Sequence, residues 1–171
     1  MRFRLEQFLP GTVEAVETAL HDPDFIARLA ELPNLGNPQL LDQRREGTLI
    51  HQRVRYAFVG DLSPAVTRFV DPARLTWVQV SRHDTRTHVT DFEIEPDHYA
   101  NRLTCRARFQ LAAEGPAATR RTANGDLSVH IPFVGRKAEQ AIVSGLVDHA
   151  RLEADTLGRW LSAQSGGEVK G

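Results

Sequence analysis

The stretch FVGRKAEQAIVSGLVDHARLEADTLGRWLSA, from Phe133 to Ala163, decides the fold of this chain. Read at about 100 degrees per residue, its apolar and polar side chains separate onto opposite faces for about eight turns, which predicts one long helix. The apolar face carries Ala138, Ala141, Ile142, Leu146, Ala150, Leu157, Trp160 and Leu161. This face is broader than a coiled-coil seam, so the helix needs a wide surface to lie against.

Ionisable side chains interrupt this apolar face. Glu153 falls near its centre, His149 on one shoulder and Glu139 on the other. Because an unpaired buried carboxylate is costly, each Glu must meet a cation, a hydrogen-bond donor, water or a ligand. Pairing with arginines of neighbouring strands is the commoner arrangement, and contact with a ligand is the alternative. Either arrangement indicates that the helix faces a partly polar space.

The bulk composition bounds the class of protein. The 171 residues suit a single domain, and the formal net charge of −1 lacks the basic excess of an electrostatic nucleic-acid binder. One cysteine excludes an internal disulfide and a four-cysteine zinc site. We find neither the apolar core of a signal peptide nor an apolar run long enough to span a bilayer. These observations predict a soluble cytoplasmic protein, monomeric or homodimeric, without integral membrane association.

Upstream of the helix, short alternating segments predict a sheet. A strand is predicted over residues 2–8, short helices over 13–20 and 24–32, and a turn-rich break over 33–38. Further strands are predicted over residues 39–46, 49–59, 75–83, 87–95, 103–111 and 119–131, with a helical turn after Ser63-Pro64. Consecutive strands with short connections indicate an antiparallel sheet, whose apolar face must be covered. Only the C-terminal helix is large enough to cover it.

The stretch GDLSVHIPFVG, residues 125–135, leads from the last strand into the helix and is followed by Glu139 and by Arg159-Trp160-Leu161. Together with the order of the elements, it resembles the START-like (SRPBCC, helix-grip) superfamily, and more narrowly the family catalogued as domain of unknown function 2505. The resemblance implies an α+β fold, in which a curved antiparallel sheet of about six to seven strands wraps on the C-terminal helix. It implies one START-like domain over residues 1–163, a flexible tail over 164–171, and no established substrate.

A curved sheet cannot lie flush along a straight helix, so a cavity between them is expected. Its lining would be mostly apolar with a few polar anchors, as in small-molecule sites. The predicted ligand-binding residues are Val54, Tyr56, Phe58, Trp77, Gln79, Phe92, Cys105, Phe109, Val129, Glu139, Leu146, His149, Glu153 and Trp160. For any one of them, filling an ordinary core is the commoner role. The leading hypothesis is binding, transport or sequestration of a small hydrophobic or amphipathic molecule such as a lipid, without a cofactor.

Two other functions stay open. His149 and Glu153 stand four residues apart on one helix face, where the carboxylate could orient the imidazole. A polyketide cyclase- or isomerase-like enzyme could then use His149 as a general base. The further alternative is a co-chaperone-like protein-interaction module, which would have a collapsed interior.

The remaining reactive residues form no recognised motif, and no metal site is predicted. His83 and His88 flank a hairpin tip at a spacing that matches no zinc pattern, so they are expected to be exposed turn residues. Cys105 is expected to be an inert, buried small hydrophobe. A group of arginines is expected on the solvated outer face of the sheet, with an acidic partner or a lipid headgroup as the minor alternative: Arg106, Arg108, Arg120 and Arg121.

Overall fold

The computed structural model describes residues 1–59 and 62–167, except for the side chains of residues 34, 35, 37 and 165–167. Its strands are β1 (Arg2–Pro10), β2 (Asn34–Glu46), β3 (Leu49–Val59), β4 (Thr76–Asp84), β5 (Val89–Pro96), β6 (Leu103–Ala113) and β7 (Ala118–Val129). Its helices are α1 (Val13–Leu20), α2 (Pro23–Arg28), α3 (Pro64–Thr67) and α4 (Gly135–Gly167), with 3-10 turns η1 (Leu29–Glu31) and η2 (Pro72–Arg74).

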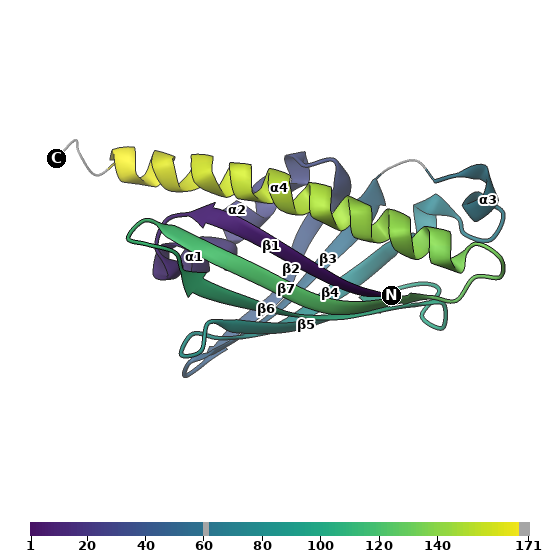
Figure 1. Ribbon diagram of the computed structural model, residues 1–171, viewed down its shortest axis with the longest axis horizontal. Coiled ribbons are helices and arrows are strands. Elements are labelled where there is room, and N and C mark those ends of the chain that lie inside the picture. Colours follow the sequence, from purple (N-terminus) through teal and green to yellow (C-terminus); the bar gives the residue numbers. More distant parts are fainter. Residues whose placement is uncertain (60–61, 168–171) are drawn as a thin grey trace.

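The strands form one antiparallel sheet in the order β1-β7-β6-β5-β4-β3-β2. All neighbouring strands except β1 and β7 are consecutive in the chain, so successive hairpins build the sheet. The long helix α4 lies alongside β1 and β7, while α1 and α2 cover one end of the sheet (Figure 1). This arrangement confirms the predicted helix-grip fold, with two short helices after the first strand.

Local sequence signals explain where the short helices begin. Thr12 caps α1, since its Oγ1 accepts a hydrogen bond from the backbone nitrogen of Ala15 at 3.3 Å. Asp22 caps α2 in the same way, accepting from the nitrogen of Asp24 at 2.8 Å, and Pro23 stands at the first helical position. These caps fix where α1 and α2 begin, and apolar packing with Leu157 places both helices beside the C-terminal half of α4.

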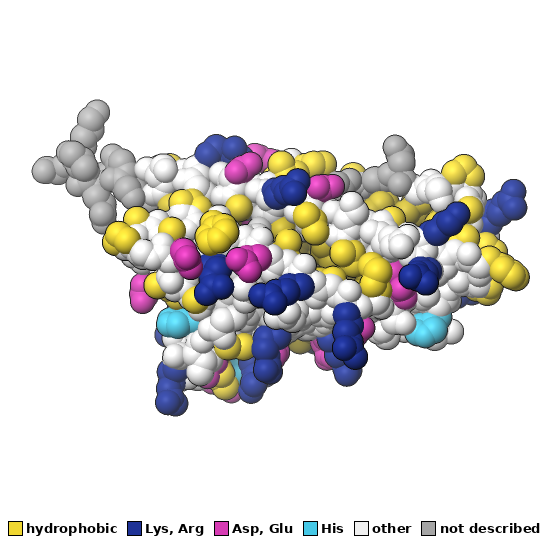
Figure 2. Space-filling model, in the orientation of Figure 1, with side chains coloured by type: hydrophobic (Ala, Val, Ile, Leu, Met, Phe, Trp, Pro, Cys, Tyr) yellow, Lys and Arg dark blue, Asp and Glu magenta, His cyan; other side chains and the backbone are white. Residues whose placement is uncertain are grey.

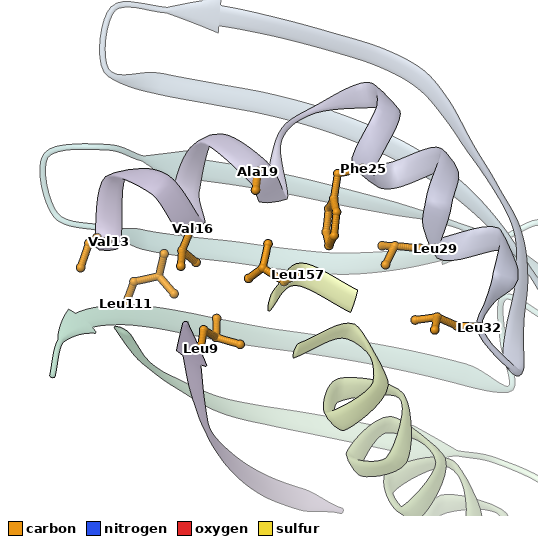
Figure 3. Close-up of a cluster of buried hydrophobic side chains, with 9 residues drawn as sticks. All are labelled: Leu9, Val13, Val16, Ala19, Phe25, Leu29, Leu32, Leu111 and Leu157. Carbon is orange, nitrogen blue, oxygen red and sulfur yellow. The ribbon is translucent and has the colours of Figure 1, made fainter. Parts of the chain in front are cut away.

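A dry core lies where α4 meets α1 and α2 (Figure 3). Leu157 of α4 is fully buried among side chains of β1, α1 and α2. The buried members of this core are Leu9, Val13, Val16, Ala19, Phe25, Leu29, Leu32, Leu111 and Leu157. Trp160 packs against it with its ring edge-on to Phe25, at a centroid distance of 5.8 Å. The C-terminal half of α4 is therefore fastened by close apolar packing.

The boundaries of β2 and α4 differ from the prediction. Strand β2 already begins at Asn34, inside the predicted turn-rich break. Its register shifts between Gly36 and Gln39, and Pro38 is tolerated because β2 lies at the edge of the sheet. Helix α4 begins at Gly135 rather than Phe133 and continues to Gly167, past the predicted end at residue 163. Residues 168–171 of the predicted tail lie outside the described residues.

The apolar face of α4 is buried over only part of its length. Ala150 and Leu157 are buried as predicted, whereas Ala141 and Ile142 are exposed. Because α4 runs along β1 and β7 at one edge of the sheet, only part of a broad apolar face meets it. In the described part of the chain, no helix is both long and apolar enough to cross a membrane.

Candidate functional site

The inner face of the sheet presents the predicted strand residues toward α4. Strand register places Tyr56 opposite Trp77 and Val54 opposite Gln79, and the alternation carries the same face across to β7. The predicted residues on this face are Val54, Tyr56, Phe58, Trp77, Gln79, Phe92, Cys105, Phe109 and Val129. The alternating pattern of the sequence therefore placed all of them on the correct face.

These inner-face residues divide into a buried group and an open group. Val54, Tyr56 and Cys105 are buried, the first two beside Ile26 of α2. The others are only half-buried, although they point toward α4: Phe58, Trp77, Gln79, Phe92, Phe109 and Val129. Since a side chain on an inner face stays half-buried only where nothing closes over it, part of this face is open to solvent.

The N-terminal half of α4 lies over this open region. Between Arg136 and His149, no side chain of α4 is buried, and Leu146 is half-buried. Hydrophobic side chains are visible along the line where α4 crosses the sheet (Figure 2). The inner face beside this half of α4 is therefore partly exposed rather than closely packed.

Stacked aromatic rings form the wall of the open face. Phe92 and Phe109 stack at a centroid distance of 5.0 Å, with 12° between their planes. Half-buried Trp77 stacks on the buried ring of Tyr56 at a centroid distance of 6.1 Å. The guanidinium of Arg121 lies 5.5 Å from the centre of the Phe109 ring, within the range of a cation–π interaction. The wall is therefore apolar, with one cation at its side.

A buried polar network separates the open face from the dry core. Arg121 donates to both carboxylate oxygens of Glu153, at 3.3 and 2.6 Å, and its Nε donates to Gln7 at 2.7 Å. Gln7 in turn donates to the backbone oxygen of Ala150 on α4. Burial by itself would raise the pKa of Glu153, but the charge and hydrogen bonds of Arg121 hold that pKa below its ordinary value.

The predicted pairing of Glu153 with a strand arginine is confirmed, but the predicted location of that arginine is wrong. Arg121 was expected on the outer face, whereas it stands in register with Gln7 and Leu111 on the inner face. Neighbouring Arg120 is directed the other way and pairs with Glu114. Two adjacent arginines in a strand must point to opposite faces, so a cluster of four could not share one face.

His149 has a buried ring nitrogen without a partner. Its Nδ1 is buried and makes no hydrogen bond with any described residue. Burial lowers the pKa of His149, the charge of Glu153 opposes this, and the charge of Arg121 adds to it. Both carboxylate oxygens of Glu153 accept from Arg121, and in the described chain no hydrogen bond joins Glu153 to the imidazole. The imidazole is therefore neutral near pH 7 and has hydrogen-bonding capacity to spare.

Three other predicted site residues, Glu139, Trp160 and Cys105, have roles within the fold itself. Glu139 accepts a hydrogen bond from the backbone nitrogen of Val129 at 3.0 Å, and its expected arginine partner is absent among the described residues. It fastens the first turn of α4 to the end of β7. Trp160 lies against the dry core, beyond the polar network. Burial and the charge of Asp126 raise the pKa of the Cys105 thiol to about 11, which fits an inert cysteine.

A second polar cluster was missed, because two histidines were expected to be exposed turn residues. His83 is only 1% exposed, and its Nε2 lies 2.8 Å from Oε1 of Glu17 on α1. Nδ1 of His88 lies 2.6 Å from the same oxygen. His83 alternates in phase with Gln79, and that signal could have placed it on the inner face. The cluster ties α1 to the β4–β5 hairpin, and in the described chain no group of His, Cys, Asp or Glu is arranged to hold a metal.

Two further hollows lie on the surface. One is lined by Phe8 and Pro10 at the end of β1 and by Gly158 and Arg159 of α4. The other lies over the charged residues of β4 to β7, including Arg82, Asp91, Arg106 and Arg108. The second hollow includes Phe92 in its lining, whereas Phe109, Arg121 and His149 line neither of the two.

Comparison with known proteins identifies the family. A model of the family described as "Protein of unknown function (DUF2505)" matches residues 5–161. No curated protein sequence matches the chain significantly.

Solved structures share the fold at low sequence identity. The protein TTHA0849 from Thermus thermophilus has a TM-score of 0.69 and 16% identity, with 96% of this chain and 99% of that chain covered. Norcoclaurine synthase from Thalictrum flavum has a TM-score of 0.66 and 12% identity, with 96% of each chain covered. The ZhuI aromatase/cyclase from Streptomyces sp. R1128 has a TM-score of 0.65 and 10% identity, with 96% and 95% covered. At such identities, the likeness shows the fold alone.

Proposed function

We propose that this chain, which belongs to the DUF2505 family of proteins of unknown function, binds a small hydrophobic or amphipathic molecule on the open inner face of its sheet. The observation that carries the proposal is the aromatic wall around Phe92 and Phe109, which points inward yet is only half-buried. When an apolar molecule displaces water from exposed apolar side chains, the free energy of the system falls. The inner face therefore favours a ligand that fills the space beneath Leu146.

The polar border of the open face indicates what else the ligand carries. Nδ1 of His149 is buried without a partner, and an unsatisfied buried polar atom costs about 1–3 kcal/mol. A hydroxyl or carbonyl group on the ligand would satisfy the imidazole, while Arg121 and Glu153 already satisfy each other. The best-fitting ligand is a mostly apolar molecule with one polar group. The finer proposal is carriage or sequestration of such a molecule by a cytoplasmic monomer or homodimer.

Native mass spectrometry of the purified protein, followed by extraction of anything bound, tests this proposal. We expect a co-purifying lipid, isoprenoid or aromatic compound, or a rise in melting temperature with members of an apolar compound panel. Leu146→Trp fills the open space and should abolish both signals. Ser144→Trp places the same side chain on the exposed, polar side of the same helix and should abolish neither.

An empty protein, with no thermal shift across the panel, would contradict ligand binding and favour the protein-interaction alternative. Retention of the ligand in Leu146→Trp would also contradict the proposed location. If Ser144→Trp loses the ligand as well, the effect belongs to the helix and not to the inner face.

A cyclase- or isomerase-like reaction is the second candidate. Its support is His149, whose lowered pKa leaves the imidazole unprotonated near pH 7 and able to accept a proton. Once a ligand class is known, turnover of that compound should disappear in His149→Ala while binding persists. Equal turnover in His149→Ala would contradict a catalytic role for His149, and no turnover by the wild-type protein would leave binding as the only function.

A further inference from the structure

The end of the molecule where α4 begins carries an aromatic ring held in water. The Phe133 side chain is 100% exposed, and its backbone φ is 65°, in the left-handed region that non-glycine residues rarely adopt. The nitrogen of Val134 donates to the oxygen of Pro132 at 2.8 Å, and the nitrogen of Gly135 donates to Ile131 at 3.0 Å. This tight turn is strained, and it fixes the ring outward at a position where the fold gains nothing from it.

A second exposed phenylalanine lies at the same end. Phe69 follows α3 and is 40% exposed. Its backbone oxygen accepts a hydrogen bond from Arg102 at 3.1 Å, and the oxygen of Arg102 accepts one from the nitrogen of His130 at 2.7 Å. Arg102 thus joins the segment of Phe69 to the segment that leads to Phe133. We call Phe69 and Phe133 the apolar tip.

Unpaired cations surround the apolar tip. This cationic collar consists of Arg68, Arg74, Arg102, Arg136 and Lys137, and among the described residues none of them forms an ion pair with a carboxylate. Arg74 and Arg102 flank the ring of Tyr99 at 5.6 and 5.7 Å, and that ring's hydroxyl accepts from the nitrogen of Asp71. Figure 2 shows basic and hydrophobic side chains together at this end, on the right of the view.

The arginines on the outer face of the sheet differ from those of the collar. There, arginines are matched with carboxylates across the strands, Arg106 with Glu93 at 3.1 Å and Arg108 with Asp91 at 2.6 Å. Paired charges offer little to an outside partner, whereas unpaired ones keep their full attraction for anions. The collar is therefore a cationic surface suited to an anionic partner.

We propose that the apolar tip and the cationic collar dock this protein on the surface of an anionic lipid membrane. Exposed aromatic rings surrounded by arginine and lysine match the membrane interface, where rings enter the acyl boundary and cations meet lipid headgroups. The contact is peripheral, in agreement with the absence of a membrane-spanning helix in the described chain. The docking surface is separate from the inner face of the sheet and does not rest on the proposed ligand.

Co-sedimentation with vesicles tests the proposal. The wild-type protein should bind vesicles of phosphatidylcholine mixed with phosphatidylserine, and binding should weaken as salt is raised. Phe133→Ser should weaken binding about tenfold through lost apolar burial. Arg136→Gln with Lys137→Gln should weaken it about 25-fold, since each basic residue near an anionic surface contributes about fivefold.

Matched variants outside the tip serve as controls. Phe8→Ser removes a ring that is 62% exposed near the opposite end of the molecule, and Arg106→Gln with Arg108→Gln removes two outer-face cations; both should leave vesicle binding unchanged. Leu146→Trp should also leave it unchanged, which separates a failure of docking from a failure of ligand binding. Phe133→Gly removes the ring at a position whose φ glycine adopts freely, so its loss of binding cannot be attributed to misfolding.

Four outcomes would overturn the proposal. They are no binding to phosphatidylserine vesicles at low salt, equal binding to pure phosphatidylcholine, equal losses in the tip and control variants, and full binding by Phe133→Gly. Binding of the collar to an acidic peptide without vesicle binding would assign the surface to a protein partner instead.

Discussion

The two halves of α4 have different surroundings, although one amphipathic pattern runs through both. In the C-terminal half, Leu157 is fully buried beneath α1 and α2. In the N-terminal half, no side chain between Arg136 and His149 is buried, and the sheet below presents half-covered aromatic rings. Helix periodicity thus predicts which side of a helix faces the sheet, but other elements decide whether the space between them is filled.

The polar network of Arg121, Glu153 and Gln7 stands where the two halves meet. It spans β1, β7 and α4, and the side chains of Arg121 and Glu153 are only 9% and 14% exposed. A buried ion pair contributes little net stability but fixes which groups can lie beside each other. Here it stops the dry core from extending toward Leu146, so the open face keeps its border.

The largest expected effect is a loss of stability in the dry half. Leu157→Ala should lower the free energy of unfolding by about 4 kcal/mol, because it leaves a cavity among close-packed side chains. Leu146→Ala deletes the same atoms over the open face and should cost about 1 kcal/mol, since solvent already reaches that side chain. Urea unfolding of both variants gives the comparison. Equal losses would mean that the N-terminal half of α4 is as tightly packed as the C-terminal half.

A smaller loss of stability is expected when the buried ion pair between Arg121 and Glu153 is broken. Arg121→Met leaves Glu153 buried without its cation and should lower the free energy of unfolding by about 3 kcal/mol. The double variant Arg121→Met with Glu153→Leu removes both charges and should recover most of that loss. Urea unfolding at neutral pH measures both. A double variant as unstable as the single one would show that the pair stabilises the fold beyond satisfying its own charges.

The stability of the fold should depend on pH through protonation of His149, which lies beside Arg121 and Glu153. Its folded-state pKa lies below the ordinary 6.5, so below that pH the unfolded chain binds a proton that the folded protein resists. Stability should therefore fall as the pH drops from about 7.5 to about 5.5, by at most about 1.4 kcal/mol per pH unit for one group. Urea unfolding across this range should show a shallower fall in His149→Gln.

His21 also contributes to the fall in stability, so His149→Gln should remove only part of it. Burial lowers its pKa too, and nearby His83 adds to the shift, so His21 contributes to the fall with the same sign. Glu153 does not contribute to the pH dependence in this range. Its pKa is lowered from the ordinary 4.5, so it changes the stability only at pH values near and below 4.5. A fall as steep in His149→Gln as in the wild type would show that His149 titrates normally.

Alternation and periodicity were sufficient to predict the sheet and α4. Strand residues such as Tyr56, Trp77 and Phe109 lie on the predicted face, because a period of two leaves no other choice once one face is apolar. Arg121 and His83 follow the same alternation, yet they were assigned to solvent by residue type. Polar residues in phase with an apolar face should be treated as buried and their partners sought.

The partners themselves could not be derived from the sequence. Glu17 meets His83 and His88 only because α1 packs across the sheet, and Glu153 meets Arg121 only because α4 crosses β7 at that point. These contacts join residues 32 to 71 positions apart. Nor could the pattern show that Ala141 and Ile142 stay exposed, since that depends on where along the sheet the helix lies.

The smallest expected effect concerns the turn into the open half of α4. Phe133→Gly should raise the free energy of unfolding by about 0.5 kcal/mol, because relief of the left-handed backbone exceeds the entropy that glycine loses. Phe8→Gly, at an exposed position within β1, should lower it by about 1 kcal/mol, because glycine weakens a strand. If the two variants change the free energy of unfolding in opposite directions, the native Phe133 destabilises the fold. A loss in Phe133→Gly as large as that in Phe8→Gly would mean that the ring stabilises the fold through contacts, and that no external partner is needed to explain it.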